Sequence, residues 1–129
     1  MLRELIPKDK FDTSSFEQLL ALSDEQIDEI TPDLLTWIQD MNWPVAPYMI
    51  KVLSSHREVT ESHLLVLLKP EQNDAEWKLH IIRDLLRNWT SFPNDLIMKE
   101  IARIASHPTR EEKSEEVDVA ADEYLEDLA

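Results

Sequence analysis

The chain has 129 residues, enough for one domain with a buried core, and a formal net charge of −14 at pH 7. It lacks cysteine, which excludes disulfides and thiolate metal sites, and glycine, which excludes phosphate-binding loops and nucleophile elbows of the usual form. Its acidic balance disfavours nucleic acid and anionic membranes, which are bound through lysine and arginine, and favours a basic partner protein. We therefore predict a single domain over residues 1–129.

Helix-starting signals recur along the chain and predict about eight helices. Residues 14–30 hold two short segments, the first behind a capping box at 14–17. The next helix, 31–41, has Pro32 in its first turn, where no hydrogen-bond donor is lost. Caps or prolines, followed by apolar residues at spacings of three and four, predict further helices at 43–54, 58–69, 74–89, 94–106 and 110–127.

The predicted helices are joined by short loops, so neighbours in the chain should be antiparallel. After the N-terminal cap at 14–30 they pair as 31–41 with 43–54, 58–69 with 74–89, and 94–106 with 110–127. We predict an all-α fold, a short right-handed α-solenoid of about three helix pairs plus the N-terminal helical cap.

Three local features carry further expectations. Because no glycine is present, Asn42, Asn73 and Asn88 are expected to close helix ends in the left-handed region. The apolar run 64–68 predicts a helix that is buried on most sides. Residues 111–129 hold nine acids and one lysine, a net charge of −8, but their apolar stripe predicts a docked helix. That stripe consists of Val117, Ala121, Tyr124 and Leu128.

A short pattern occurs twice, 34 residues apart, and reads Asp-Met-Asn-Trp-Pro-Val at 40–45 and Asp-Ala-Glu-Trp-Lys-Leu at 74–79. Repeats of this period are typical of stacked helix pairs. Both copies resemble the turn and the inner-helix opening of HEAT/Armadillo repeats. In that family an arginine usually follows the aliphatic residue, whereas Ala46 and His80 stand there in this chain, and the third pair has Thr109 as cap in place of aspartate.

Longer segments at 5–10, 37–46 and 108–113 carry a second resemblance. Through them the chain resembles a small bacterial family of about this length, known as a domain of unknown function with an Armadillo-like fold. The resemblance implies a helical-repeat fold and almost no activity. It supplies no catalytic residues.

The helix at 74–89 carries a polar stripe at spacings of four, three and four, formed by Glu76, His80, Arg83 and Arg87. In helical-repeat proteins the second helix of each pair lines the concave surface, where extended partners bind. We expect a basic strip that binds a carboxylate-rich peptide or the chain's own acidic final helix. The alternative is a solvated face with charge pairs such as Glu76 with His80.

The predicted partner site is accordingly a groove lined by the helices at 44–54 and 74–89. Lys51 is expected to face this groove. Of the four tryptophans we expect core packing, with Trp43, at a helix junction, as the one that is half exposed. The predicted partner-binding residues are Lys51, His80, Arg83, Arg87 and Trp43.

No pattern in the chain predicts catalysis or metal binding. Glu76, His80 and Asp84 recur every four residues on one helix, so only two of them could reach one ion, whereas a catalytic zinc site has three protein ligands. We predict no catalytic residue, no metal and no cofactor. Solvated or capping roles are expected for the remaining histidines, His56, His63 and His107.

We therefore expect a non-enzymatic protein-interaction module, and in one version an immunity or antitoxin-like inhibitor of a basic partner. One alternative is a small helical-repeat enzyme with an acidic pocket between helices, which would need a buried carboxylate of raised pKa. Another is a structural homodimer that makes contact through Phe11, Phe16 or Leu128. We expect a monomer, and a cytoplasmic location because the start of the chain reads as too short and too acidic for a signal peptide.

Overall fold

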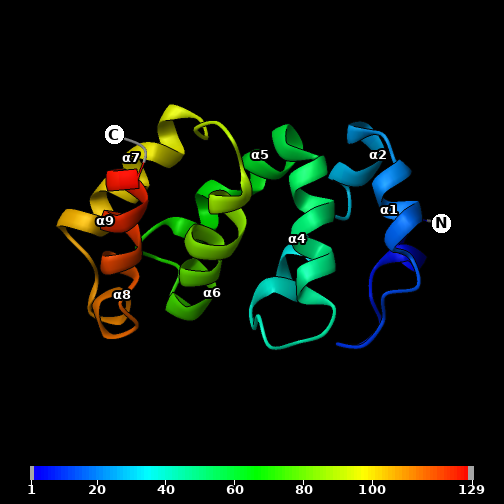
Figure 1. The fold of residues 1–129 in the computed structure, drawn as a ribbon, viewed down its shortest axis with the longest axis horizontal. Helices are drawn as coiled ribbons and strands as arrows, with labels where there is room; N and C mark the ends of the chain where they lie inside the picture. Colours follow the sequence, from blue (N-terminus) through cyan, green and yellow to red (C-terminus); the bar gives the residue numbers. More distant parts are fainter. Residues whose placement is uncertain (1, 128–129) are drawn as a thin grey trace. The chain divides into compact units, whose positions relative to one another are not determined.

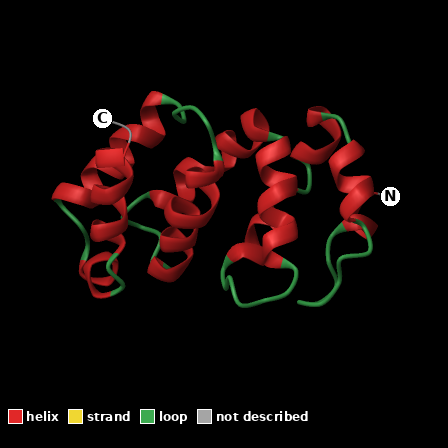
Figure 2. Cartoon of the chain, viewed as in Figure 1, coloured by secondary structure: helices red, strands yellow, loops and turns green. Residues whose placement is uncertain are grey.

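The computed structural model describes residues 2–127, and Figure 1 traces their course. Figure 2 shows helices joined by loops, and no strand occurs between residues 2 and 127, which confirms the all-α prediction. The chain divides into two compact units, Met1–His63 and Leu64–Ala129, and the boundary between them falls within helix α5. Both units contain fully buried apolar side chains.

The first unit is built from short helices around a small apolar core. Its fully buried side chains include Leu19 and Ile27 from the early helices and Met49 and Leu53 from α4. The helical cap predicted at 14–30 corresponds to α1 and α2. In chain order the helices are η1 (Leu2–Leu5), α1 (Phe16–Ala21), α2 (Asp24–Asp28), α3 (Thr31–Leu35), η2 (Thr36–Ile38), α4 (Ala46–Ser55) and α5 (Arg57–Leu68), which ends in the second unit.

The capping box predicted at 14–17 is wrong. Helix α1 has no side-chain cap, because the Ser14 hydroxyl donates to Asp12 (2.6 Å) instead of pairing with the helix. A capping box occurs at the start of α2, where Ser23 and Gln26 bond each other's backbone N–H groups. The local hydrogen bond of Ser14 to an aspartate thus takes the place of the predicted cap of α1.

The helix predicted at 31–41 is shorter than expected. Its α-helical part ends at Leu35 and continues as a 3₁₀-helix to Ile38. The Asp40 carboxylate then accepts a hydrogen bond from the Asn42 backbone N–H (2.8 Å), which closes a turn. Aspartate side chains favour such turns over a continued helix, so the turn leads into α4.

The second unit begins within α5 and contains longer helices. Two predicted caps are confirmed: Asp74 accepts from Trp77 N–H, and Thr109 forms a capping box at the start of α8. Asn94 caps α7, at the predicted start of that helix. The helices after α5 are α6 (Ala75–His80), which continues as a π-helical segment η3 (Ile81–Leu85) and a 3₁₀-helix η4 (Leu86–Asn88), then α7 (Asp95–Ser106), α8 (Arg110–Ser114) and α9 (Val117–Asp127).

The final helix predicted at 110–127 is broken into two. Glu115 and Glu116 separate α8 from α9, and Glu116 has a φ of 60°, in the left-handed region. Among residues 2–127 it is the only non-glycine residue with a positive φ. No asparagine in this range adopts the left-handed conformation, so the prediction that asparagines close the helices in this way is wrong. With no glycine in the chain, a glutamate adopts the turn that folds α9 back.

Helix α9 packs mainly against α7, and its apolar stripe is buried as predicted at Val117, Ala121 and Tyr124. Leu128, the last predicted member of the stripe, lies outside the described residues. The prediction for 64–68 is wrong in part. The outer leucines of that run are fully buried, but Val66 is 65% exposed, so one face of α5 remains open.

Candidate functional site

The polar stripe predicted on the helix at 74–89 contacts the chain's own acidic segment. Arg87 forms an ion pair with Asp127 of α9, the final helix. The Arg83 side chain is half exposed, and its guanidinium lies 3.8 Å from the neighbouring Asp84 carboxylate. The π-helical segment η3 carries Arg83 and Asp84, and it changes the α-helical spacing on which the stripe was predicted.

His80, in the middle of the stripe, is buried rather than solvated. Its Nδ1 lies 3.1 Å from Asp84 Oδ2. Its Nε2 lies 3.7 Å from Glu76 Oε1, too far for a hydrogen bond, and has no other partner among the described residues. The part of the chain that the structure describes contains no group of three histidine or acidic side chains arranged to hold a metal ion.

The remaining two predicted site residues, Lys51 and Trp43, belong to the first unit. Lys51 is exposed on α4. The Trp43 ring is partly exposed and packs edge-to-face on Trp37, with 5.5 Å between the ring centroids. Core packing is confirmed for Trp77, whereas Trp37, Trp43 and Trp89 all keep part of their surface exposed.

Two adjoining hollows open on the second unit, and carboxylates line both. The first, of about 380 Å³, lies between the start of α6 and α8. The second, of about 200 Å³, has Leu79, Val119 and Ala120 at its apolar part. Glu115 lines both hollows, so they form one surface, and Arg110 and Arg83 are the basic residues beside it. We call this surface the acidic face and define it by Asp74, Glu76, Glu111, Glu115, Glu116 and Glu123.

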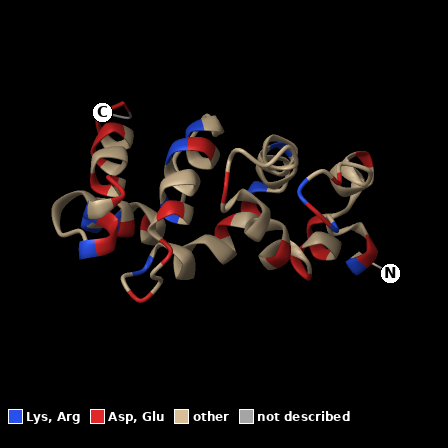
Figure 3. Cartoon of the chain, turned by 90° about the horizontal axis from the view of Figure 1, so that it is seen from below, with Lys and Arg blue, Asp and Glu red and all other residues tan. Residues whose placement is uncertain are grey.

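Sequence reasoning found the acids of this face but not their arrangement. Glu115, Glu116 and Glu123 are all exposed to solvent. Figure 3 shows acidic residues recurring along the helix that runs to the C-terminus. The turn at Glu116 brings these acids next to the start of α6, and a positive φ at a glutamate leaves no signal in the sequence.

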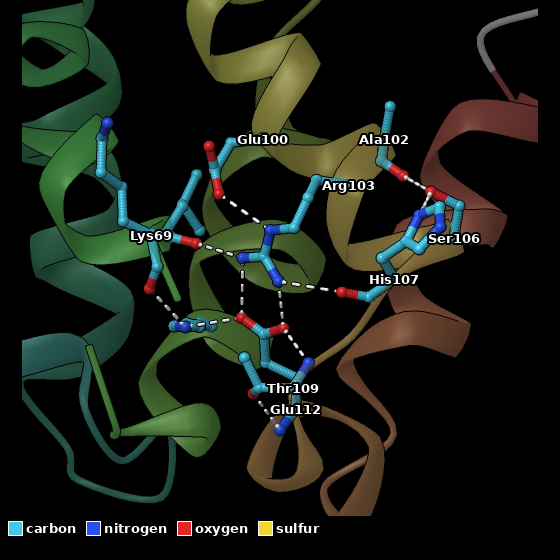
Figure 4. A network of polar contacts seen from close by, with 10 residues as sticks. Lys69, Glu100, Ala102, Arg103, Ser106, His107, Thr109 and Glu112 are labelled. Carbon is cyan, nitrogen blue, oxygen red and sulfur yellow. Dashed lines mark hydrogen bonds and ion pairs between the residues drawn. The ribbon is translucent and has the colours of Figure 1, made fainter. Parts of the chain in front are cut away.

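Next to this surface an ion cluster joins α6, α7 and α8 (Figure 4); its Lys78 and Glu112 are fully buried, and its Arg103 is partly exposed. Lys78 Nζ donates to Glu112 Oε2 (2.6 Å) and to the Lys69 carbonyl (2.8 Å). The Arg103 guanidinium donates to both Glu112 oxygens, at 2.6 and 3.0 Å. The Thr109 backbone N–H donates to Glu112 Oε1 (2.8 Å), which completes the capping box.

The charges of this cluster stabilise one another. Burial by itself would raise the pKa of Glu112, but hydrogen bonds from Arg103, Lys78 and Thr109 N–H lower that pKa to about 2. Burial opposes the charge of Arg103 as well, yet its hydrogen bonds to Glu112 and Glu100 raise its pKa. Glu112 therefore stays ionised and fully hydrogen-bonded, and it does not have the raised pKa that a general acid needs.

The sequence predicts one half of this cluster. Glu112 completes the capping box of Thr109, the cap that the sequence predicts. Its pairing with Lys78 was missed, although one signal was available. Lys78 interrupts an apolar stripe on α6 and η3 that includes Ala75, Ile82 and Leu85, and a lysine at such a position requires a buried partner.

Residues 5–125 match the model of a protein family described as Domain of unknown function (DUF5071). A comparison with curated proteins finds no match. Among the described residues no helix has the length and apolar character that crossing a membrane would require.

Proposed function

The chain belongs to the family described as Domain of unknown function (DUF5071). We propose that this member of the family is a non-enzymatic module that binds a basic protein through the acidic face. One observation carries the proposal: two adjoining hollows are lined by six carboxylates and share Glu115. Cationic side chains of a partner would lie in these hollows, and no bond would be made or broken.

The second hollow has the chemistry that a lysine or arginine side chain requires. Such a side chain has an apolar stem and a charged head. Leu79 and Val119 would contact the stem, and the carboxylates of Glu115, Glu116 and Glu123 would surround the head. Val119 is 45% exposed, so this apolar surface is open to a partner.

The net charge of the whole chain supports the same proposal. A charge of −14 attracts a basic partner over long distances and raises its association rate at low salt. An immunity or antitoxin-like inhibitor of a basic toxin is the specific version that we favour, because such an inhibitor needs fast capture and no chemistry of its own.

The enzyme alternative requires a carboxylate of raised pKa in a groove. The buried carboxylate of the described residues is Glu112, and its pKa is lowered to about 2. Its oxygens accept from Lys78, Arg103 and Thr109. These contacts favour the binding module over the enzyme.

With this function we propose a right-handed, Armadillo/HEAT-like α-solenoid as the architecture. We also propose that the protein is bacterial and cytoplasmic. Lys51 and Trp43 of the first unit and Arg83 of the second unit would each be a further contact of the partner. Because Arg87 is paired with Asp127, we place the main contact on the acidic face.

The proposal can be tested by capture from the native lysate at low and high salt, followed by mass spectrometry. The variant Glu115→Lys/Glu123→Lys reverses two charges of the acidic face. The control Glu17→Lys/Glu25→Lys reverses two exposed charges of the first unit, so both variants change the net charge equally.

We expect the wild type and the control to retain a basic partner at low salt and to release it at high salt. The acidic-face variant should bind this partner at least about tenfold more weakly, as for the loss of a central contact. Equal retention by both variants, or a partner that is itself acidic, would contradict the proposal.

A further inference from the structure

His80, in the second unit, is a buried side chain with one ring nitrogen left unpaired. Its side chain is only 8% exposed, and its Nε2 has no hydrogen-bond partner among the described residues. By contrast His56, which occupies the cap position of α4, meets an oxygen at each ring nitrogen. A buried polar atom without a partner costs folding free energy, so the unpaired nitrogen of His80 indicates a place that a ligand would complete.

The backbone at His80 is irregular as well. The histidine ends α6 and stands directly before the π-helical segment η3. Single π-helical turns are rare in proteins, and they occur frequently at functional sites. The unpaired nitrogen and the π-helical turn are separate observations, and both fall at the same residue.

The contacts of the ring give its two nitrogens different roles. Nδ1 lies 3.1 Å from Asp84 Oδ2, and because a carboxylate only accepts, the proton of the neutral ring belongs on Nδ1. Nε2 then carries a lone pair and can accept a hydrogen bond. No described residue donates to it, so neither Arg83 nor Arg110, the arginines beside the acidic face, fills this role.

Nε2 faces a carboxylate that lines the first hollow of the acidic face. Glu76 Oε1 lies 3.7 Å from Nε2, and Glu76 is one of the residues around that hollow. The Glu76 side chain is 59% exposed, so it can be reached from solvent. A nitrogen and an oxygen at this separation can both lie about 2.9 Å from donors placed beside them. The pair therefore offers two acceptors to a group that enters from the hollow.

The group that satisfies both acceptors must be a cation with at least two N–H donors. Asp74, Glu111 and Glu115 line the same hollow and add to its negative potential. A guanidinium fits better than an ammonium, because its planar fork presents neighbouring N–H groups and because it is more weakly hydrated, which suits a buried acceptor. A metal ion fits poorly, since the described residues form no set of three histidine or acidic ligands.

We propose that His80 Nε2 and Glu76 form a subsite of the acidic face that binds an arginine side chain of the basic partner. The guanidinium donates one N–H to the Glu76 carboxylate and another to Nε2, while Asp84 holds the ring in the accepting orientation. The inference rests on the proposed function and names the residue type that the first hollow takes.

The lone pair can be observed directly in the full chain. Long-range ¹H–¹⁵N NMR spectra of the histidine rings are recorded at about pH 8, at the basic end of the histidine range. The probes are two peptides blocked at both ends, tetra-arginine and tetra-lysine, which carry the same charge. The exposed ring of His107 serves as the internal control.

We expect tetra-arginine to move the Nε2 signal of His80 toward that of a nitrogen that accepts a hydrogen bond, and to leave the His107 ring unchanged. Tetra-lysine should move the Nε2 signal much less. An Nε2 signal that stays in place at saturating tetra-arginine, or that responds equally to tetra-lysine, would overturn the proposal.

A pair of matched variants measures the energetic share of the subsite. Glu76→Gln removes the carboxylate beside Nε2, and Glu111→Gln removes another exposed carboxylate of the same hollow. Calorimetric titration at low salt should show tetra-arginine binding about tenfold more weakly to Glu76→Gln, as for the loss of a hydrogen bond to a charged group. The loss in Glu111→Gln should be no more than about threefold, the effect of one exposed charge. Equal losses in the two variants would contradict the subsite.

These experiments separate the inference from the proposed function. Peptide bound anywhere on the acidic face should move the backbone amide signals of Glu115 and Glu123, which line the hollows. If those amide signals move while Nε2 of His80 does not, the arginine subsite is wrong and the acidic face remains the binding surface. If neither responds to tetra-arginine, both proposals are contradicted.

Discussion

In the first unit the deeply buried ionisable side chain is His56, and its carboxylate partner, Asp24, is 60% exposed. In the second unit the corresponding side chain is Lys78, and its partner Glu112 is as buried as the lysine itself. The first contact is open to water on its aspartate side. The second joins an ammonium group to a carboxylate whose pKa is lowered to about 2.

The two contacts differ in what happens to their charged groups when the contact is broken. Because Asp24 is exposed, breaking the first contact leaves the aspartate in water, where it is solvated. A buried ion cluster keeps its charges, and because breaking it leaves an unpaired charge in the interior, it favours one arrangement of α6, α7 and α8. We therefore expect the first unit to be the adjustable one.

The largest effect should come from Glu112→Ala, which leaves Lys78 buried without its counter-ion. We expect the free energy of unfolding to fall by about 3–5 kcal/mol, the usual cost of breaking a buried pair from one side. Urea unfolding measures this change. The control is Glu111→Ala, which removes the exposed acid next to it and should change stability by no more than about 0.5 kcal/mol. Similar losses in both variants would contradict the comparison.

The same experiment sharpens the prediction of a single domain. Trp37 and Trp43 report on the first unit, and Trp77 and Trp89 report on the second. If the chain unfolds as one domain, all four indole signals of Glu112→Ala will shift to the same lower urea midpoint. A loss confined to the second pair would show that the units unfold separately.

Acid should weaken the second unit's cluster. The pKa of Glu112 falls from its ordinary value of 4.5 to about 2 on folding, so its contribution is complete above about pH 4.5 and is lost as the pH falls through about 2. The contribution is about 3 kcal/mol at most. A ¹³C NMR titration of the Glu112 carboxyl group should give a midpoint near 2, and a midpoint near 4.5 would contradict the pairing.

A smaller effect should separate two helix starts, one from each unit. Asp74→Ala removes the side-chain cap of α6 and should reduce the free energy of unfolding by about 1 kcal/mol. Ser15→Ala should change it by less than about 0.5 kcal/mol, because Ser15 makes no capping hydrogen bond. Urea unfolding of both variants measures the difference, and equal losses would show that the cap of α1 forms in solution.

The smallest effect should occur at the break between α8 and α9. Glu116→Gly relieves a left-handed backbone and should raise the free energy of unfolding by about 0.5–1 kcal/mol. Glu115→Gly, where φ is −93°, should lower it by about the same amount, because glycine adds freedom to the unfolded chain. Thermal unfolding of the two variants should therefore give shifts of opposite sign.

The sequence by itself determined where most helices begin. The caps at Asp74, Asn94 and Thr109 were predictable because a cap bonds a backbone N–H two or three residues further along the chain. The apolar stripe of α9 was predictable for the same local reason, since residues three and four apart share a helix face. Such rules reach over about one turn of helix.

Only the tertiary structure decided which charged groups became buried partners. His56 meets an aspartate 32 residues away, and Lys78 meets a glutamate 34 residues away. The turn at Glu116 likewise depends on the packing of α9 against α7, which outweighs the local preference of a glutamate. Contacts at these separations depend on how whole helices pack, and the spacing of residues along the chain does not encode that packing directly.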